Sequence, residues 1–183
     1  MDIDFSIVEE TSLTGKQRKD KKRLQALCFG DIDPREIEED FYNPEIANVL
    51  AYLGENLVGW AGIHQAKVEF EDRKVKLGGL GICTHPDWRR RGIATTVSRE
   101  AMDYLRHKGC DIAFLSIDTA RRGSKQLHEK NGFVSLPRKF SWTNKLGIVK
   151  ESSGGMIAPV CSLELFEQVA NGEETLYVGR GYW

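Results

Sequence analysis

The chain has 183 residues, of which 40% are hydrophobic and 29% are charged, and its formal net charge is -1. This length and composition are typical of one ordinary globular domain, so we expect a single domain over residues 1–183 rather than a disordered or fibrous chain. The charge argues against nucleic acid as the main partner, because nucleic-acid-binding domains usually carry a clear basic excess.

The sequence shows no export or membrane signal. The N-terminal segment MDIDFSIVEE is acidic and has no basic leader before an apolar stretch, and no run approaches the roughly 20 apolar residues of a membrane span. Neither CxxC pairs nor a dense disulfide pattern is formed by the four cysteines, Cys28, Cys83, Cys110 and Cys161. We therefore expect a cytoplasmic protein with no membrane partner and no bound metal.

The N-terminal half predicts a strand, a helix and three further strands. Residues 3–10 alternate apolar and polar side chains, and Ser12 or Thr14 can cap the helix that follows. That helix opens with the basic run KQRKDKKR, and the acidic run DIDPREIEED comes after it. The two opposite runs favour solvated helix faces over a nucleic-acid patch. Successive antiparallel strands are then predicted at residues 46–53, 56–70 and 75–86.

The C-terminal half alternates helices and strands. Residues 92–110 carry apolar side chains at helical spacing and predict a helix that stops at Gly109. Residues 111–118 predict a short buried strand, and residues 120–133 predict a second helix. Further strand-like segments are residues 133–142 and 155–163. This order indicates one mixed α/β sheet rather than separate domains.

The segment HPDWRRRGIAT places three arginines and a glycine at the start of a predicted helix. The first turn of a helix has N–H groups without intrahelical partners, and the helix dipole favours negative charge there. Gly92 lets a ligand approach the backbone closely, and guanidinium groups match the geometry of phosphate. The segment therefore predicts a pyrophosphate cradle, and it is neither a Walker A loop nor a GxGxxG motif.

Two motifs resemble those of the GCN5-related N-acetyltransferases, the GNAT superfamily. The run RRRGIA, residues 89–94, matches the family signature (Q/R)-x-x-G-x-(G/A) and lies between a predicted strand and a long predicted helix. Downstream, QLHEKNGF, residues 126–133, looks like the family segment LYEKxGF. The resemblance covers residues 45–140. It implies an α+β fold of the GNAT type, with a mixed, mostly antiparallel central sheet flanked by helices and a splayed fourth strand.

The resemblance also implies an enzyme, an acyl-CoA-dependent N-acetyltransferase with acetyl-CoA as cosubstrate. Backbone groups of Ile82, Cys83 and Thr84 would bind the pantetheine arm, which lies along the fourth strand. An N–H of Ile82 or Cys83 would stabilise the negative charge that develops on the thioester oxygen. The pyrophosphate cradle would comprise Arg89, Arg90, Arg91, Gly92, Ile93, Ala94 and Thr95.

Three positions depart from the family pattern. His128 stands where many members have a tyrosine that protonates the departing thiolate, and a histidine can either serve as this acid or only pack and contact CoA. Arg121 replaces a frequent asparagine, and Gly78 replaces the strand glutamate that many members use as general base. Weaker candidates for the base are Glu69, Glu71, Asp72 and Asp118.

The final segment, EETLYVGRGYW, ends on Trp183. The aminoglycoside 2'-N-acetyltransferases are similar in length and also end on a tryptophan, and in that subgroup the terminal carboxylate contacts the amino sugar. The resemblance implies a catalytic, acceptor-site role for Trp183, with a hydrophobic plug of the sheet as the alternative. Gly181 stands where the subgroup has a substrate-binding aspartate, which weakens the case for an aminoglycoside.

The expected reaction is transfer of an acetyl group from acetyl-CoA to a primary amine of a small cationic acceptor, such as an amino sugar or a polyamine. Three alternatives stay open. In the first, the protein acetylates protein N-termini or lysines. In the second, it is a non-catalytic CoA-binding or nucleic-acid-associated module. In the third, it is an acyltransferase with a longer acyl donor, for which Gly78, Gly79 and Gly81 leave room. A homodimer is also compatible with the resemblance, because dimers are common in the superfamily.

Overall fold

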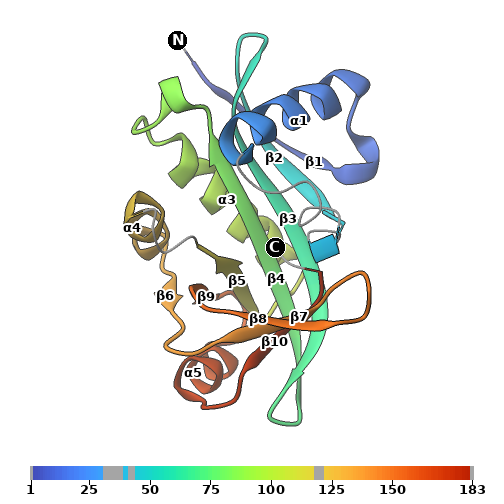
Figure 1. Cartoon of the computed structure of the whole chain (residues 1–183). Coiled ribbons are helices and arrows are strands. Elements are labelled where there is room, and N and C mark those ends of the chain that lie inside the picture. Colours follow the sequence, from blue (N-terminus) through green and yellow to red (C-terminus); the bar gives the residue numbers. More distant parts are fainter. Residues whose placement is uncertain (1, 31–38, 41–43, 118–121, 182–183) are drawn as a thin grey trace.

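The computed structural model describes residues 2–30, 39–40, 44–117 and 122–181, which form two sheets with helices packed on them (Figure 1). The main sheet has seven strands in the order β1-β2-β3-β4-β5-β9-β6, and the smaller sheet has three in the order β10-β7-β8. In the described part of the main sheet only β4 and β5 run parallel. The prediction of a mixed, mostly antiparallel central sheet flanked by helices is confirmed.

The bounds of the elements are as follows. The strands of the main sheet are β1 (Asp4–Glu9), β2 (Ala47–Leu53), β3 (Asn56–Phe70), β4 (Arg73–Thr84), β5 (Ile112–Ser116), β6 (Val134–Ser135) and β9 (Gly155–Pro159). The smaller sheet consists of β7 (Phe140–Thr143), β8 (Val149–Ser152) and β10 (Leu176–Arg180). The helices are α1 (Gly15–Phe29), α3 (Ile93–His107), α4 (Arg122–Lys130) and α5 (Leu163–Asn171), with short 3-10 turns at Glu10–Ser12 and Pro86–Trp88.

Local sequence sets the ends of α1 and α3. Thr14 caps α1 in a capping box, because its Oγ1 accepts from the N–H of Gln17 at 3.2 Å while Gln17 Oε1 accepts from the N–H of Thr14 at 2.9 Å. The predicted cap at Thr14 is thereby confirmed. α3 ends at His107, and Gly109 just beyond it has a φ of 66°, a left-handed conformation that glycine adopts without strain.

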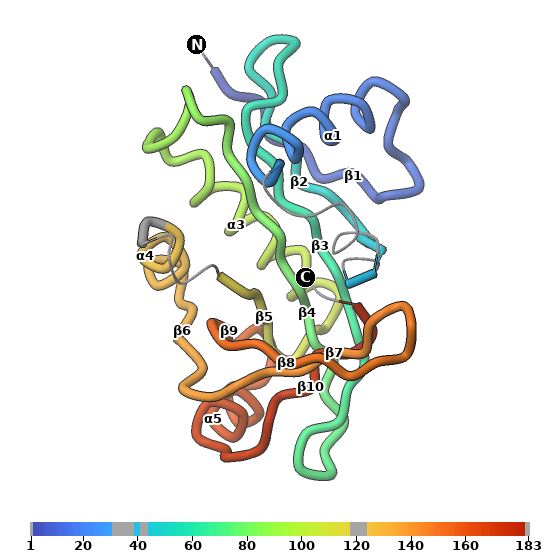
Figure 2. The backbone as a smooth tube through the Cα atoms, in the orientation of Figure 1, coloured from blue at the N-terminus to red at the C-terminus, as the bar shows by residue number. Residues whose placement is uncertain are grey.

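Different elements cover the two faces of the main sheet. α3 packs on one face, against Val49 and Ala61 among others. α1 packs on the other face, where Leu24 meets Trp60. Val68 lies on the same face as Trp60, because the two are an even number of residues apart in a regular strand, and it packs against the smaller sheet. Figure 2 shows α1 near one end of the β3–β4 pair and the smaller sheet near the other.

β4 and β5 diverge at one end, so that the main sheet opens there. Their pairing is limited to residues 77–79 of β4 and residues 112–114 of β5. β4 continues to Thr84 and β5 to Ser116 without further pairing between them. The splayed fourth strand is therefore confirmed, and we refer to the opening between residues 80–84 and residues 115–116 as the β4–β5 split.

The structure departs from the sequence predictions after α4. Residues 133–142, expected to be one strand-like segment, form the two short strands β6 and β7, because Pro137 has no N–H to donate and interrupts the ladder. β6 pairs with β9, whereas β7 pairs with β8 and β10. α5 has no counterpart among the predictions, although Ser162 caps it by accepting from the N–H of Leu165 at 3.2 Å.

None of the helices in the described ranges is long and apolar enough to cross a membrane. The described residues also contain no group of three or more His, Cys, Asp or Glu side chains that could hold a metal ion. All four cysteines are free. Cys83 and Cys110 are buried as small apolar residues, whereas Cys28 is half-buried and Cys161 is exposed.

Candidate active site

The N-terminus of α3 has the features of an anion-binding site. Gly92 is its N-cap residue, is exposed, and has a left-handed φ of 81°. Because Gly92 has no side chain to cap the helix, no cap within the described residues engages the N–H groups of Ile93, Ala94 and Thr95. The N–H of the next residue, Thr96, donates to the Gly92 carbonyl at 3.0 Å. Free N–H groups and the helix dipole together favour an anion at this point.

The three arginines before Gly92 are held in different ways. The Nε of Arg89 donates to the Thr84 carbonyl at 3.3 Å, which ties this side chain to the end of β4. Arg91 lies over the Trp88 ring, with its guanidinium carbon 4.6 Å from the ring centroid. Arg90 has a left-handed φ of 61°. All three are exposed, so an approaching phosphate meets both positive charge and uncapped N–H groups.

The free edge of β4 presents backbone groups to the β4–β5 split. The N–H of His85, just after β4, donates to the Val58 carbonyl of β3 at 3.0 Å. Successive residues of a strand point their backbone groups alternately to the two sides, so the N–H and C=O of Thr84 and of Ile82 point away from β3. The Thr84 carbonyl accordingly accepts from side chains instead. The N–H of Ile82 therefore faces the split, whereas the N–H of Cys83 faces β3.

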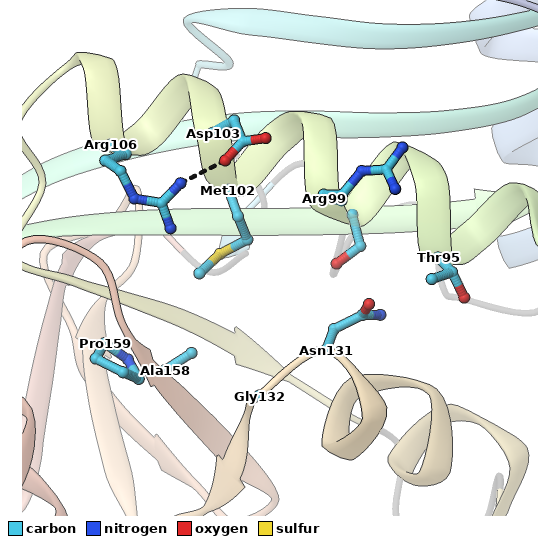
Figure 3. A pocket seen from close by; sticks show the side chains of 10 residues that line it. Thr95, Arg99, Met102, Asp103, Arg106, Asn131, Gly132, Ala158 and Pro159 are labelled. Carbon is cyan, nitrogen blue, oxygen red and sulfur yellow. Dashed lines mark hydrogen bonds and ion pairs between the residues drawn. The ribbon is translucent and has the colours of Figure 1, made fainter.

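A groove continues from the N-terminus of α3 along this helix (Figure 3). Its volume is about 280 Å³, and its walls are α3, the turn after α4 and the end of β9. Thr95 belongs both to the groove and to the first turn of α3. Figure 3 shows Asn131 pointing from the turn toward α3, and the hydrogen-bonded Arg106 and Asp103 farther along the helix. The groove therefore runs along α3 from the N-terminal turn that is suited to bind an anion.

His128 lies on α4, the first described element after β5. Its side chain is 6% exposed, and its ring packs edge-on against Phe133 with the centroids 5.8 Å apart. Burial lowers the pKa of His128 to about 4, so the ring is neutral near pH 7. Its Nδ1 has no hydrogen-bond partner among the described residues. At neutral pH the side chain can therefore offer a neutral N–H but not an imidazolium.

Glycines replace larger side chains next to the split on the face that α1 covers. Gly62 of β3 lies opposite Gly81 of β4, and His64 lies opposite Gly79. The Trp60 ring extends over this region, 3.5 Å from the position that a Cβ at residue 81 would occupy. We call Gly62, Gly79 and Gly81 the glycine strip. It lies between the part of this face covered by α1 and the part covered by the smaller sheet.

A buried ion-pair network borders the glycine strip. Lys21 of α1 is 8% exposed and binds the carboxylates of Glu10 and Glu45. Sequence reasoning missed these three residues as a group, because they come from separate elements and Lys21 sits inside a basic run that reads as a solvated face. The one signal available was that Lys21 falls three residues before the inward-facing Leu24, at helical spacing.

Cys28 of α1 and Cys83 of β4 form a pair of thiols beside the split. In its protonated form Cys28 donates its S–H to the Thr84 carbonyl, with Sγ 3.5 Å from the oxygen. A hydrogen bond with Cys83, helped by the positive charge of Arg89, lowers the pKa of Cys28 to about 7. The same hydrogen bond and burial raise the pKa of Cys83. Cys28 is therefore substantially thiolate at neutral pH, whereas Cys83 stays protonated.

The weaker candidates for the general base gain no support from the geometry. Glu71 and Asp72 form the β3–β4 turn with φ values of 46° and 62°, and Glu69 is exposed beside them. This turn lies at the end of β4 opposite to the split. Three other residues singled out in the sequence lie outside the described residues: Asp118, Arg121 and Trp183.

The glycines of β4 reflect packing rather than room for a long acyl chain. A Cβ at Gly78 would meet the Leu105 side chain of α3, and a Cβ at Gly81 would be in ordinary contact with Trp60. The space beside Gly78 is thus already filled by Leu105, whereas a Cβ at Gly81 would fit against Trp60. The expectation that Gly78, Gly79 and Gly81 make room for a longer donor has no support at Gly78 or Gly81.

Comparisons with known proteins agree with this geometry. The sequence profile of the Acetyltransferase (GNAT) family matches residues 18–133. Among curated protein sequences, none matches the chain. The ribosomal-protein-S18-alanine N-acetyltransferase from Escherichia coli has a similar structure, with a TM-score of 0.56 and 14% identity over 87% of this chain and 96% of that one.

Two further solved structures have the same fold. The NatC complex bound to Gag peptide and CoA contains a chain that matches with a TM-score of 0.59 and 15% identity, over 87% of this chain and 99% of that chain. The aminoglycoside acetyltransferase meta-AAC0020 from an uncultured soil metagenomic sample, in complex with trehalose, matches with a TM-score of 0.54 and 13% identity, over 70% of this chain and 86% of that one.

The residues at the start of α3 fit acetyl-CoA. Apart from Gly92 and the chain next to it, no heavy atom of the described residues lies within 4 Å of the position that a Cβ at Gly92 would occupy, so the space beside the start of α3 is open. This open space adjoins the arginines and the free edge of β4, as an elongated ligand with a pyrophosphate group requires. Because the family profile also covers well over half of the sequence, the chain belongs to the GNAT family of acetyl-CoA-dependent N-acetyltransferases.

Proposed function

We propose that this acetyltransferase moves the acetyl group of acetyl-CoA to a primary amine of a small cationic acceptor, such as an amino sugar or a polyamine. The observation that carries the proposal is the uncapped N-terminus of α3, which lies among exposed arginines at the end of the splayed β4. One side of the sheet is thus built for the anionic cosubstrate. The acceptor would then enter from the other face of the sheet, on which α1 packs.

The binding of the cosubstrate follows from the exposed backbone groups. Acetyl-CoA supplies an acetyl thioester, which is already activated toward attack by an amine. The N–H groups of Ile93, Ala94 and Thr95 and the side chains of the three arginines would bind its pyrophosphate. The Ile82 N–H faces the split, so it is better placed than that of Cys83 to donate to the thioester oxygen as negative charge develops there.

His128 belongs to the same proposal as a hydrogen-bond donor. A ring with a pKa of about 4 is almost never protonated near pH 7, so it is a poor source of a whole proton. A neutral imidazole N–H can nevertheless stabilise the departing thiolate by a hydrogen bond. The buried Nδ1 has no hydrogen-bond partner among the described residues, which is consistent with a ring that forms hydrogen bonds to a bound ligand.

The preference for a cationic acceptor rests on the charges beside the glycine strip. The carboxylate of Glu45 lies over Gly62 and can attract an acceptor ammonium, whereas Glu10 is already paired with both Lys21 and Arg18. The amino sugars and polyamines are therefore first choices. Protein N-termini are the next, because the chain shares its fold with a ribosomal-protein-S18-alanine N-acetyltransferase and with a chain of the NatC complex bound to a peptide. The role of Trp183 in the acceptor site stays a prediction.

The alternative of a nucleic-acid-associated module receives no support from the basic run of α1. Three of its cations are engaged inside the protein: Lys16 pairs with Asp20 at 2.8 Å, Arg18 pairs with Glu10 at 2.9 Å, and Lys21 is buried. Salt-sensitive retention on RNA or DNA would revive this alternative.

The proposed function is tested by calorimetric titration with acetyl-CoA, followed by an acceptor screen read by mass spectrometry of the acetylated product. The screen contains spermidine, glucosamine, an aminoglycoside and a peptide that starts with alanine. Mass spectrometry is preferred to thiol reagents because Cys28 and Cys161 would react with them. Acetylation of a small amine supports the proposal. Binding of acetyl-CoA with acetylation of the peptide alone would contradict the small acceptor.

A further inference from the structure

The general base of the reaction is not at the position where the family resemblance places it, because that position is Gly78. The carboxylates that the structure brings toward the split are those of the buried network beside the glycine strip. Lys21 Nζ lies 2.9 Å from Glu10 Oε2 and 2.5 Å from Glu45 Oε2. Asn48 links Glu10 to Trp60, because its Nδ2 donates to Glu10 Oε2 at 2.7 Å and its Oδ1 accepts from Trp60 Nε1 at 2.8 Å.

Glu45 is the member of the network that lies over the strands. Its carboxyl carbon is 3.2 Å from the position that a Cβ at Gly62 would occupy, and Trp60 ring atoms are 2.4 and 2.8 Å from it, so a side chain at residue 62 would displace the Trp60 ring and crowd Glu45. Gly62 is directly opposite Gly81, the residue before Ile82, at the edge of the split. The carboxylate therefore lies over β3 at the strand position next to Gly81 of β4, beside the Trp60 ring that covers both glycines.

The electrostatic effect of Glu45 on β4 supports this placement. The pKa of the Cys83 thiol, next to Ile82, is raised mainly by its hydrogen bond with Cys28 and by burial, and the charge of Glu45 adds to this effect. The charged and titratable groups near Glu45 are Lys21 from α1, Glu10 from the 3-10 turn after β1, and Cys83 from β4. The carboxylate of Glu45 therefore interacts electrostatically with β4, the strand whose free edge faces the proposed position of the thioester.

The two carboxylates have opposite pKa shifts. Burial and the nearby charge of Glu10 raise the pKa of Glu45, although Lys21 counteracts part of this effect. Hydrogen bonds from Asn48 and Lys21 outweigh the effect of burial at Glu10 and lower its pKa. When environments push the pKa values of two neighbouring carboxyl groups apart, the one with the higher pKa is the better proton acceptor near neutral pH.

The network also reaches solvent. Glu10 and Lys21 line a pocket of about 480 Å³ at the start of α1, together with the exposed Lys19 and Lys22. The Glu45 side chain is 15% exposed, whereas that of Glu10 is 27% exposed. Glu45 is thus the inner end and Glu10 the outer end of a hydrogen-bonded chain that leads from the glycine strip to the surface.

We propose that Glu45 is the general base of the acetyl transfer and that Lys21 and Glu10 are positioning residues that hold it and connect it to solvent. This inference rests on the proposed function. The acceptor ammonium gives one proton to Glu45, directly or through a water molecule, and the neutral nitrogen then forms the new N–C bond while the C–S bond breaks. The nitrogen loses a second proton as the amide forms, the CoA sulfur gains one, and one proton in total is released to solvent.

The test compares Glu45→Gln with the matched variant Glu10→Gln, using the amine from the screen that is acetylated fastest. We expect Glu45→Gln to lower kcat by about 100-fold or more and to abolish the acidic limb of the pH profile, since the amide cannot accept the proton. Glu10→Gln removes a negative charge next to Glu45, so it should keep the limb and shift it to lower pH. The acetyl-CoA affinity of both variants, measured by calorimetry, should stay within threefold of the wild type.

Several outcomes would overturn this role of Glu45. One is a Glu45→Gln variant with wild-type kcat and an unchanged acidic limb. Another is an acidic limb that persists in Glu45→Gln and disappears in His64→Asn, which would assign the base to the histidine opposite Gly79. A wild-type protein that binds acetyl-CoA and acetylates no amine in the screen would overturn the proposed function itself. Thermal unfolding of each variant separates loss of catalysis from loss of the fold.

Discussion

The side chain of Leu105 lies where any side chain at residue 78 would have to be. A Cβ built on Gly78 would be 2.5 Å from Leu105 Cδ1 and 2.7 Å from Leu105 Cδ2, closer than real Cβ atoms come to their neighbours. Residue 78 therefore points into the core that α3 forms with the sheet, and it is glycine because α3 packs so closely there. The strand glutamate of the family has no room at this position, and the base must come from another element.

The first prediction concerns this contact. Gly78→Ala should destabilise the protein by about 1–3 kcal/mol, because the added methyl group forces Leu105 or the backbone to move. Gly81→Ala in the same strand is the control, because its Cβ would be in ordinary contact with Trp60 at 3.5 Å. Urea unfolding measures both variants. Equal stability losses at the two positions would show that Leu105 is not the cause.

The second prediction concerns the cradle. Gly92→Val places a β-branched residue at a φ of 81°, which costs about 1–3 kcal/mol and should weaken acetyl-CoA binding by roughly 5- to 150-fold. Gly147→Val is the matched control, because Gly147 has a φ of 80°, has equally open surroundings, and lies in the turn between β7 and β8. Calorimetry with acetyl-CoA should show a loss of affinity at position 92 only. Unchanged affinity in Gly92→Val would remove the cradle assignment.

The third prediction separates chemistry from binding at His128. His128→Phe should lower kcat by about 10- to 100-fold through loss of one hydrogen-bond donor, while the acetyl-CoA affinity changes less than threefold. His128→Asn retains an N–H donor and should recover part of the turnover. The readouts are steady-state kinetics and calorimetry. Full activity in His128→Phe would restrict His128 to its packing against Phe133.

The fourth prediction concerns stability at acid pH. Burial lowers the pKa of His128 from 6.5 to about 4, so between these values the unfolded chain binds a proton at this residue that the folded chain does not. Stability should therefore be unaffected by His128 above pH 6.5 and should fall as the pH decreases toward 4. Between pH 7.5 and pH 5 the wild type should lose about 2 kcal/mol more than His128→Phe, as measured by urea unfolding at the two pH values. Equal losses would place the histidine in a more solvated site.

The fifth prediction concerns the thiol pair. The hydrogen bond with Cys83 is the main cause of the lowered pKa of Cys28, so Cys83→Ala should slow the alkylation of Cys28 at pH 7 several-fold. Cys83→Ser retains a donor and should slow it less. Iodoacetamide labelling followed by peptide mass spectrometry measures Cys28 separately from the exposed Cys161. Identical rates in the wild type and Cys83→Ala would exclude this hydrogen bond as the cause.

Much of the fold could be predicted from the sequence where elements are long and strongly patterned. β3, β4 and α3 lie close to their expected ranges, and Thr14 caps α1 as its position before the helix suggests. The prediction was poorest after residue 133. Short strands such as β6 carry little periodicity, and they exist only because β9 offers them a partner far along the chain.

The cradle could also be predicted from the sequence alone, because one continuous segment forms it. A strand end, three arginines, a glycine and a helix start predict an anion-binding site wherever the rest of the chain goes. The choice between Ile82 and Cys83 needed the tertiary structure, since only the pairing with β3 shows which N–H groups are left for the split.

The carboxylates and their partners were decided by the tertiary structure alone. Glu10, Lys21, Glu45 and Trp60 come from four separate parts of the chain, and each of them alone has an ordinary explanation as a surface charge or a core residue. Their pKa values and contacts arise from burial and from distances of a few ångströms between groups that the sequence keeps far apart. The sequence by itself thus determined the proposed donor side of the enzyme, which local geometry builds, whereas long-range packing decided the proposed acceptor side.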